Sequence, residues 1–279
     1  MNIPKGTQYM LLATLTFTGM KVFVKYIPHI PAIEIVFFRA LISLFLTLGY
    51  LWPKKIPIFG NRKRLLIVRG IVGAMALILN YYLLQQIPLA AASTMTYLTP
   101  IFTTLLGIYL VKEKVRPIQI VFFLVSFMGV LIIQGFDGRI SLIHLGAGLA
   151  SSVLSAIAYN LVRKLSTTEH PLVIIFYFPL MVLPISAIWS FFVWEVPSGW
   201  DWFYLGMVGV STQMAQYFMT KSYQFAKVAQ VASFDFLGII YAILFGFILF
   251  DEYFNLITYL GMAFVLVGVI LNFRFKPKV

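Results

Sequence analysis

A succession of long apolar stretches, joined by short polar segments, constrains this chain more than any other feature. About 20 apolar residues are enough to cross a bilayer. A sliding window of about 19 residues places such stretches at 7–27, 31–51, 65–86, 90–111, 117–135, 142–163, 171–194, 201–224, 228–250 and 255–273. Lipid offers the backbone no hydrogen bonds, so each stretch is predicted to be a helix, and runs this continuous exclude the alternating pattern of a barrel. The longest joint, 52–64, is too short for a folded domain, so any activity must lie in the helices or their loops.

Composition excludes several classes of protein. Only 11% of the 279 residues are charged and 61% are hydrophobic, whereas about 25% are charged in a soluble average protein. Cysteine is absent, which removes disulfides, thiolate metal sites and cysteine nucleophiles. The chain has no Walker loop, no nucleophile-elbow sequence and no histidine pair at metal-ligand spacing. We therefore expect no enzymatic activity, no cofactor and no metal.

Basic residues predict the orientation in the membrane. Seventeen of the 21 Lys and Arg residues fall on one side if the N-terminus is inside, leaving Lys21, Lys25, Arg39 and Arg139. The positive-inside rule then predicts a multi-pass protein of the cell (inner) membrane with both termini cytoplasmic. The first stretch contains Lys21 and lacks a small-residue cleavage site, so it is expected to be a retained helix. The net charge of +12 is split into short clusters between apolar spans, which argues against nucleic-acid binding.

The two halves of the chain are related by an internal repeat. A shift of 139 residues aligns identical residues without a gap, among them Gln85/Gln224, Ala90/Ala229, Leu98/Leu237, Leu105/Leu244, Gly107/Gly246, Leu110/Leu249, Glu113/Glu252, Gly129/Gly268 and Val130/Val269. Around the matched glutamates, Lys112-Glu113-Lys114 becomes Asp251-Glu252-Tyr253, so a basic turn in one copy is acidic in the other. Five spans per copy is an odd number, so the copies, 1–136 and 137–279, are predicted to lie inverted relative to each other. Inverted repeats indicate alternating access to a site between the halves.

The segments that end the two copies carry a family resemblance. PIFTTLLGIYLVKEKVRPIQIVFFLVSFMGVLI, from Pro100, and GIIYAILFGFILFDEYFNLITYLGMAFVLVGVIL, from Gly238, share an apolar helix, a glycine, an acidic turn built on glutamate and a glycine-bearing helix. With the FFRA sequence around Arg39, the chain resembles the EamA branch of the drug/metabolite transporter (DMT) superfamily. The resemblance implies an all-α membrane protein with ten transmembrane helices. It also implies a cavity lined by spans one to four and six to nine, with spans five and ten as scaffold.

Polar residues inside a membrane are costly, so the helix face that bears them marks either a neighbouring helix or water. Such stripes occur in several spans, for example Thr14, Thr18, Lys21 and Lys25 in the first. The predicted substrate-binding residues are Lys21, Arg39, Asn80, Tyr97, Tyr159, Gln213, Gln216, Tyr217 and Asp235. The predicted hinge is Pro100, with Gly238 in the corresponding region of the second copy.

The ionic candidates leave two interpretations open. In the first, Arg39 and Lys21 offer positive charge to a carboxylate or phosphate of the substrate, while Asp235 receives an ammonium group or the coupling proton. In the second, Arg39 or Lys21 forms a structural ion pair with Asp235 or Glu34. The Ser and Thr residues of the stripes have another explanation: small and hydroxyl side chains also hold neighbouring helices together.

The favoured function is a secondary transporter of small organic metabolites, because no nucleotide-binding motif is present. Within the resembled branch, amino acids or amino-acid-derived zwitterions such as S-adenosylmethionine are the expected substrates. The alternative is an exporter of amphiphilic toxic compounds, with tyrosines lining a permissive cavity. An intramembrane enzyme or a channel is the alternative of another class. The expected partners are the small-molecule substrate, membrane lipids and protons if transport is coupled to them; the expected oligomeric state is a monomer or a weak homodimer.

Overall fold

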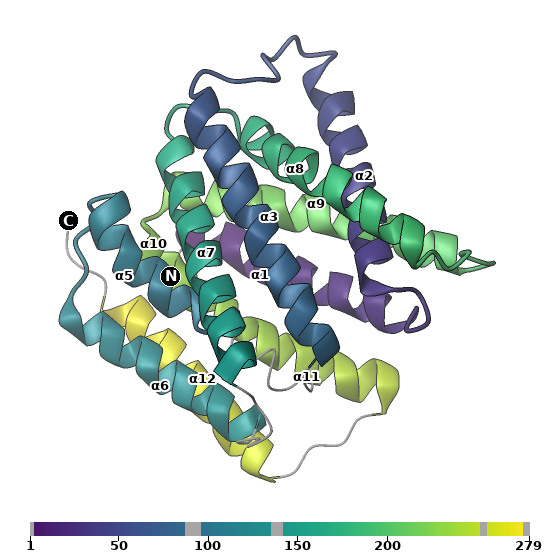
Figure 1. The fold of residues 1–279 in the computed structure, drawn as a ribbon. Coiled ribbons are helices and arrows are strands. Elements are labelled where there is room, and N and C mark those ends of the chain that lie inside the picture. The colour runs from purple at the N-terminus through teal and green to yellow at the C-terminus, as the bar shows by residue number, and fades with distance from the viewer. Residues whose placement is uncertain (1–2, 87–95, 135–141, 252–255, 276–279) are drawn as a thin grey trace.

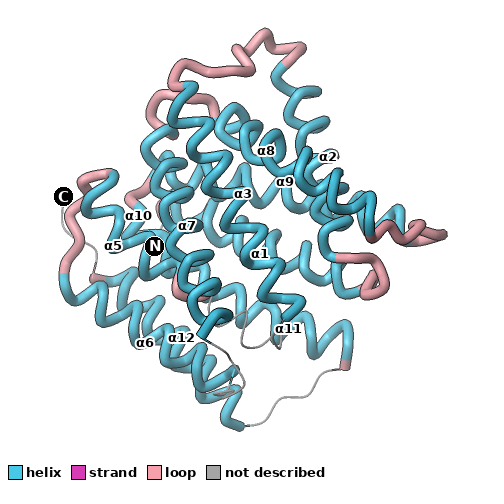
Figure 2. The backbone as a smooth tube through the Cα atoms, viewed as in Figure 1, coloured by secondary structure: helices cyan, strands magenta, loops and turns pink. Residues whose placement is uncertain are grey.

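The chain is a bundle of helices (Figure 1). The computed structural model describes residues 3–86, 96–134, 142–251 and 256–275. Its elements are α1 (Lys5–Lys25), α2 (Ala32–Leu51), α3 (Lys63–Gln86), α5 (Thr99–Leu110), α6 (Pro117–Gln134), α7 (Leu142–Leu165), α8 (Pro171–Phe192), α9 (Asp201–Phe225), α10 (Val228–Val231), the 3-10 helix η1 (Ala232–Phe236), α11 (Leu237–Phe250) and α12 (Leu256–Arg274). Most of the described loops lie at the ends of the bundle (Figure 2).

The predicted spans correspond closely to these helices. Eight of the ten predicted stretches are matched by one helix whose described ends lie within two residues of the prediction. The fourth differs: α5 begins at Thr99, and residues 87–95 of the predicted span lie outside the described residues. The ninth also differs, because α10, η1 and α11 replace the single helix that was predicted.

Among the described residues, four helical segments are long and apolar enough to cross a membrane. They are Ala32–Leu51, Leu142–Leu165, Pro171–Phe192 and Ala232–Phe250. Three shorter helical segments, Thr99–Leu110, Pro117–Ile132 and Tyr259–Asn272, are also apolar. Helices α1, α3 and α9 are less apolar because they contain polar residues, including Lys21, Arg69 and Gln213.

Helix packing repeats between the halves. The helix α1 packs along α9, and its counterpart α7 packs along α3; α1 also packs on α11, as α7 does on α5. The pairs α2/α8 and α6/α12 each join a helix to its own counterpart. Exchanging the two halves therefore leaves the pattern unchanged. Since each half contributes five spans, the fold consists of two inverted five-helix repeats.

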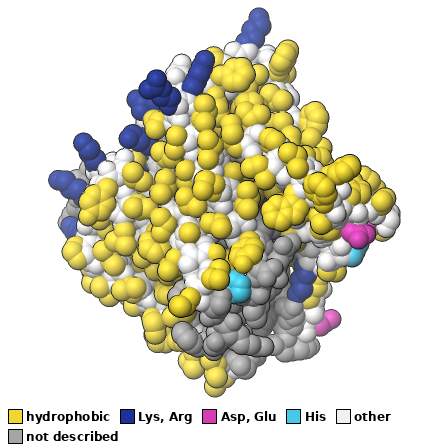
Figure 3. All heavy atoms as spheres, viewed as in Figure 1, with side chains coloured by type: hydrophobic (Ala, Val, Ile, Leu, Met, Phe, Trp, Pro, Cys, Tyr) yellow, Lys and Arg dark blue, Asp and Glu magenta, His cyan; other side chains and the backbone are white. Residues whose placement is uncertain are grey.

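The surface of the bundle is apolar, as expected for a protein embedded in lipid. Large apolar side chains cover the face seen in Figure 3, and Lys and Arg gather along its upper-left edge. Four tryptophans are exposed near the C-terminal end of α8 and the N-terminal end of α9: Trp189, Trp194, Trp200 and Trp202. Tryptophan prefers the interface between lipid and water, so this position agrees with a belt at one membrane surface.

Candidate substrate-binding centre

The described parts of the fourth and ninth predicted spans each contain an irregular segment, which we call an interruption, at matched positions of the two repeats. Tyr97 and Leu98 form a turn just before α5, and Leu237, the repeat partner of Leu98, follows the 3-10 helix η1. Pro100 is in the first turn of α5, where the lack of a backbone N–H is tolerated. Interrupted helices near the middle of a transporter expose backbone groups that can contact a substrate.

Helix α1 lies close to the place where these two interruptions meet. A Cβ added at Gly238 would lie 3.3 Å from Thr14 Cγ2, 3.6 Å from Thr18 Oγ1 and 3.9 Å from the Tyr97 hydroxyl. Thr18 Oγ1 also lies 3.4 Å from the carbonyl oxygen of Gly238. The predicted hinge residue Gly238 therefore lies beside the predicted binding residue Tyr97.

Lys21 and Asp235 bring opposite charges to this place. Asp235 lies in η1, beside Thr14 of α1, whose hydroxyl donates to the carbonyl oxygens of Met10 over 3.0 Å and of Phe234 over 3.5 Å. The charges of Lys21 and Asp235 act on each other. Among the described residues, however, the close ion pairs are His29–Asp201 and Arg163–Glu113, so Lys21 and Asp235 form no direct ion pair. The Lys21 side chain is exposed, although the charge of Asp235 reaches it.

Aromatic hydroxyls surround the acid. Tyr97 stacks on Phe236 with ring centroids 6.0 Å apart, and the charge of Asp235 reaches both Tyr97 and Tyr159. Tyr97 and Tyr159 are half-buried. We call Lys21, Asp235, Tyr97 and Tyr159 the polar centre. Residues from α1, α7 and both interrupted helices form it, so it lies between the two repeats.

Asn80 and Arg39 extend this centre. Asn80 Nδ2 donates to Thr96 Oγ1 over 3.0 Å, next to Tyr97 in the chain. Arg39 acts electrostatically on Tyr159. Six of the predicted residues, Lys21, Arg39, Asn80, Tyr97, Tyr159 and Asp235, are thus grouped in or beside one region.

The three predicted residues on α9 lie in different surroundings. Gln213 is buried, accepts a hydrogen bond from Ser43 Oγ at 2.5 Å and donates to Thr47 Oγ1 at 2.8 Å, which joins α9 to α2. The Tyr217 ring has the Lys221 ammonium 6.0 Å from its centroid, toward the end of α9. Gln216 is buried, and its Oε1 has no hydrogen-bond partner. Their role in substrate binding stays a prediction.

Sequence reasoning did not select Arg69 as a site residue, although it lies on the polar stripe of its span. It is 2% exposed. Its guanidinium carbon lies 5.0 Å from the ring centroid of Phe178, and that of Arg39 lies 5.7 Å from the same ring. Two arginines therefore share one aromatic contact beside Tyr159, on which both act electrostatically.

An ion pair at one end of the bundle was also missed. Arg163 Nε donates to Glu113 Oε1 over 2.9 Å, and Arg163 Nη1 donates to the carbonyl oxygen of Tyr223 over 2.5 Å. These contacts tie α7 to the segment after α5 and to the end of α9. In the sequence, the match of Glu113 with Glu252 in the repeat was the pattern that could have indicated a structural role for Glu113.

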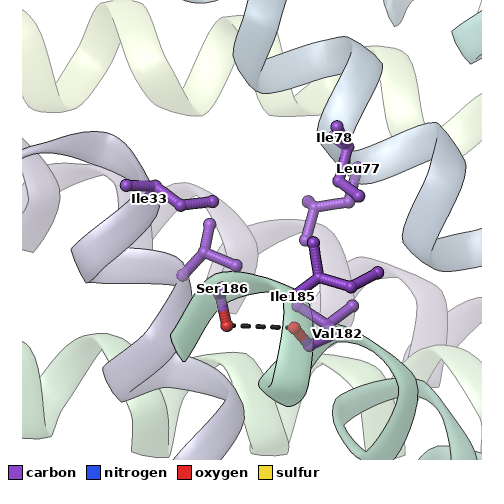
Figure 4. A pocket seen from close by; sticks show the side chains of 7 residues that line it. Ile33, Leu77, Ile78, Val182, Ile185 and Ser186 are labelled. Atoms are coloured by element: carbon purple, nitrogen blue, oxygen red, sulfur yellow. Dashed lines mark hydrogen bonds between the residues drawn. The ribbon is translucent and has the colours of Figure 1, made fainter. Parts of the chain in front are cut away.

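A pocket between α2, α3 and α8 lies elsewhere and has a different chemistry (Figure 4). Its lining is Ile33, Val36, Leu77, Ile78, Val182, Ile185 and Ser186. The hydroxyl of Ser186 donates to the carbonyl oxygen of Val182 over 3.0 Å, so it is already satisfied. This apolar pocket offers a polar substrate no recognition groups.

The paired and repeated helices agree with the comparisons to known proteins. The EamA-like transporter family matches residues 4–135 and again 142–274. The chain belongs to the EamA-like transporter family. This confirms the resemblance to the DMT superfamily, and the protein is a transporter rather than an enzyme.

Individual relatives of this EamA-like protein span nearly its whole length. The pseudopaline exporter CntI of Pseudomonas aeruginosa strain UCBPP-PA14 is 30% identical, with 98% of each chain covered. Solute carrier family 35 member G1 of Homo sapiens is 27% identical, over 88% of this chain and 73% of that protein. One solved crystal structure shares the fold with a TM-score of 0.85 at 15% identity, covering 98% of this chain and 99% of the other.

Proposed function

We propose that this EamA-like transporter is a secondary carrier of amino acids or amino-acid-derived zwitterions that works by alternating access. The observation that carries the proposal is the approach of two opposite charges that form no direct ion pair, Lys21 of α1 and Asp235 of η1, between the repeats. A zwitterion carries both complementary charges: its carboxylate would bind Lys21 and Arg39, and its ammonium group would bind Asp235.

Lys21 and Asp235 are near each other without a direct ion pair, which supports binding over a purely structural role. A direct pair would satisfy both charges inside the protein and leave nothing for a substrate. Separated charges can instead each contact one end of a zwitterion. Thr14, whose hydroxyl donates to the carbonyl oxygen of Phe234 next to Asp235, would hold this turn in place while the substrate exchanges with water.

The Arg163–Glu113 ion pair supports an alternating-access cycle. It ties together elements of both repeats at one end of the bundle, while Lys21 remains exposed. In the cycle, this end opens when the ion pair breaks, and α5 and α11 move about their interruptions at Pro100 and Gly238.

The orientation forms part of the same proposal. We place the protein in the cell (inner) membrane with both termini cytoplasmic, because exposed basic residues such as Lys54, Lys55 and Arg64 gather at one end of the helices. The Arg163–Glu113 pair then lies at the cytoplasmic end. We further propose that the protein works as a monomer or a weak homodimer.

A second candidate is an exporter of amphiphilic toxic compounds on the same scaffold. Two observations favour it: a relative is named an exporter, and the polar centre includes the stacked rings of Tyr97 and Phe236. An aromatic hollow tolerates varied apolar groups. Competition between an amphiphilic cation and the amino acid would distinguish the candidates.

Counterflow in proteoliposomes tests the proposed carrier. Vesicles loaded with an unlabelled amino acid should accumulate the labelled compound transiently, because a carrier exchanges substrate across the membrane. A panel of amino acids identifies the substrate, and protein-free vesicles give the background. Uptake without stimulation by internal substrate would indicate a channel and contradict the proposal.

A further inference from the structure

Arg69 is a buried cation with unused hydrogen-bond donors. Its Nε and Nη1 atoms are inaccessible to water and have no hydrogen-bond partner. A buried guanidinium without an acceptor loses its hydration, and the contact with the Phe178 ring does not replace the missing hydrogen bonds. Such a group is normally kept where a bound molecule supplies the acceptor.

The surroundings of Arg69 leave room for its head group and add a second cation. A Cβ at Gly73, one turn further along α3, would lie 3.4 Å from Arg69 Nη1 and 3.0 Å from Phe178 Cδ2. The absence of a side chain at Gly73 therefore lets the guanidinium and the ring pack together. Arg39 approaches the same ring, at 5.7 Å, from α2.

The charges of this region do not balance. Lys21 and Asp235 oppose each other, but Arg39 and Arg69 add two positive charges, and neither forms an ion pair with a carboxylate of the described residues. The charge of Lys21 already acts on Asp235. An anionic group would therefore stabilise Arg39 and Arg69.

We propose that Arg69 and Arg39, on the ring of Phe178, form an oxyanion site, and that the cargo carries a carboxylate or phosphate group there. Arginine suits this chemistry because its planar fork binds two oxygens of one group. The inference rests on the proposed function and narrows it: the substrate is an amino compound with an acidic group beyond its α-carboxylate. Lys21 then binds the α-carboxylate, and Arg39 binds the second acidic group together with Arg69 instead of the α-carboxylate. Arg69 is then the residue that distinguishes acidic from neutral zwitterions.

The test is ligand stabilisation of the purified protein in detergent, followed by thermal unfolding. The probes are L-alanine, L-glutamate and O-phospho-L-serine, which differ in the second acidic group, together with succinate and inorganic phosphate, which lack an amino group. Chloride at equal ionic strength is the reference. We expect glutamate or phosphoserine to raise Tm at concentrations at least tenfold below those at which alanine acts. The glutamate and phosphoserine arms distinguish a carboxylate from a phosphate.

Matched variants assign the effect to Arg69. Arg69→Gln should lose the preference for acidic compounds, whereas Arg64→Gln, an exposed arginine of the same helix, should keep it. Arg69→Lys should retain part of it, because the charge stays but the fork is lost. If Arg69→Gln does not purify as a single species, Phe178→Leu replaces it, since the ring contacts both guanidinium groups.

The outcomes separate this inference from the proposed function. Stabilisation by succinate or phosphate that disappears in Arg69→Gln supports the oxyanion site even if no amino acid is transported. Stabilisation by alanine equal to that by glutamate overturns the site and leaves the carrier of zwitterions intact. Acidic ligands that still stabilise Arg69→Gln as well as the wild type also overturn it.

Discussion

Gly129 and Gly268 are packed reciprocally, each against the helix that carries the other. A Cβ at Gly129 would lie 2.5 Å from the carbonyl oxygen of Gly261 and 2.7 Å from Val265 N, and a Cβ at Gly268 would lie 2.7 Å from Phe122 O and from Ser126 N. All three correspondences, Gly129 with Gly268, Phe122 with Gly261 and Ser126 with Val265, are separated by 139 residues. The repeat found in the sequence is therefore a two-fold relation in space, and it brings α6 and α12 into backbone contact.

The first prediction follows from this contact. Gly129→Ala and Gly268→Ala should each destabilise the protein by about 1–3 kcal/mol, because the added methyl group overpacks a backbone contact. Thermal unfolding of the purified variants measures the loss. Gly49→Ala is the control, since nothing lies within 4 Å of a Cβ there. Variants at 129 and 268 as stable as this control would contradict the packing.

The second prediction concerns the ion pair between Glu113 and Arg163. Glu113→Gln and Arg163→Gln should each lower the counterflow rate, because the end of the bundle that the pair ties no longer closes fully. The charge-exchanged double variant, Glu113→Arg with Arg163→Glu, should recover part of the rate. A coupling energy of about 0.5–3 kcal/mol from the double-mutant cycle is expected. Strictly additive effects would show that the pair does not act as a unit.

The third prediction concerns Asp235. Asp235→Asn keeps the size and removes the charge, so the apparent substrate affinity should fall by about tenfold or more. Lys21 acts on Asp235 electrostatically, and the charge of Asp235 in turn reaches Tyr97, Tyr159 and Tyr223.

Uptake by Asp235→Asn across a range of pH tests coupling to protons. If Asp235 carries the coupling proton, the variant should lose the pH dependence of the wild type. Unchanged pH dependence would remove the proton role and leave Asp235 as a binding residue alone. Asp251→Asn is the matched control, because this exposed acid follows α11 at its far end.

The fourth prediction concerns the hinge. Pro100→Ala should slow counterflow while leaving ligand stabilisation of the purified protein unchanged, because alanine restores an N–H and favours a continuous helix. Pro184→Ala, inside α8, is the control for losing a proline within the bilayer. Equal transport rates for Pro100→Ala and the wild type would remove Pro100 as a hinge.

Much of the fold could be predicted because lipid imposes one dominant rule. Continuous hydropathy fixed eight of the spans to within a few residues, and the repeat required the inversion. The interruption at Asp235 was not predicted, since a window of about 19 residues averages over one distorted turn. No simple pattern in the sequence distinguishes a local 3-10 segment such as Ala232–Phe236 from an α-helix.

The site was predicted less completely than the fold, for a physical reason. Lys21, Asp235 and Tyr159 could be selected as candidates because charged and hydroxyl groups inside lipid are costly unless they have a partner or a function. Gln213 looked the same in sequence but bonds Ser43 and Thr47, and only the packing of α9 on α2 reveals this. Arg69, near the end of its span, resembled an orientation residue, and its burial depends on Phe178 of a distant helix.

The most direct test of two inverted halves determines on which side of the membrane each of two matched turns lies. The chain contains no cysteine, so an introduced cysteine is the only residue of the protein whose thiol a maleimide can label. Lys112→Cys, after α5, and Asp251→Cys, after α11, both replace exposed residues. In intact cells a membrane-impermeant maleimide should label the cysteine at 251 and reach the one at 112 only after the membrane is permeabilised. Labelling of both from the same side would contradict the inverted architecture and the alternating access built on it.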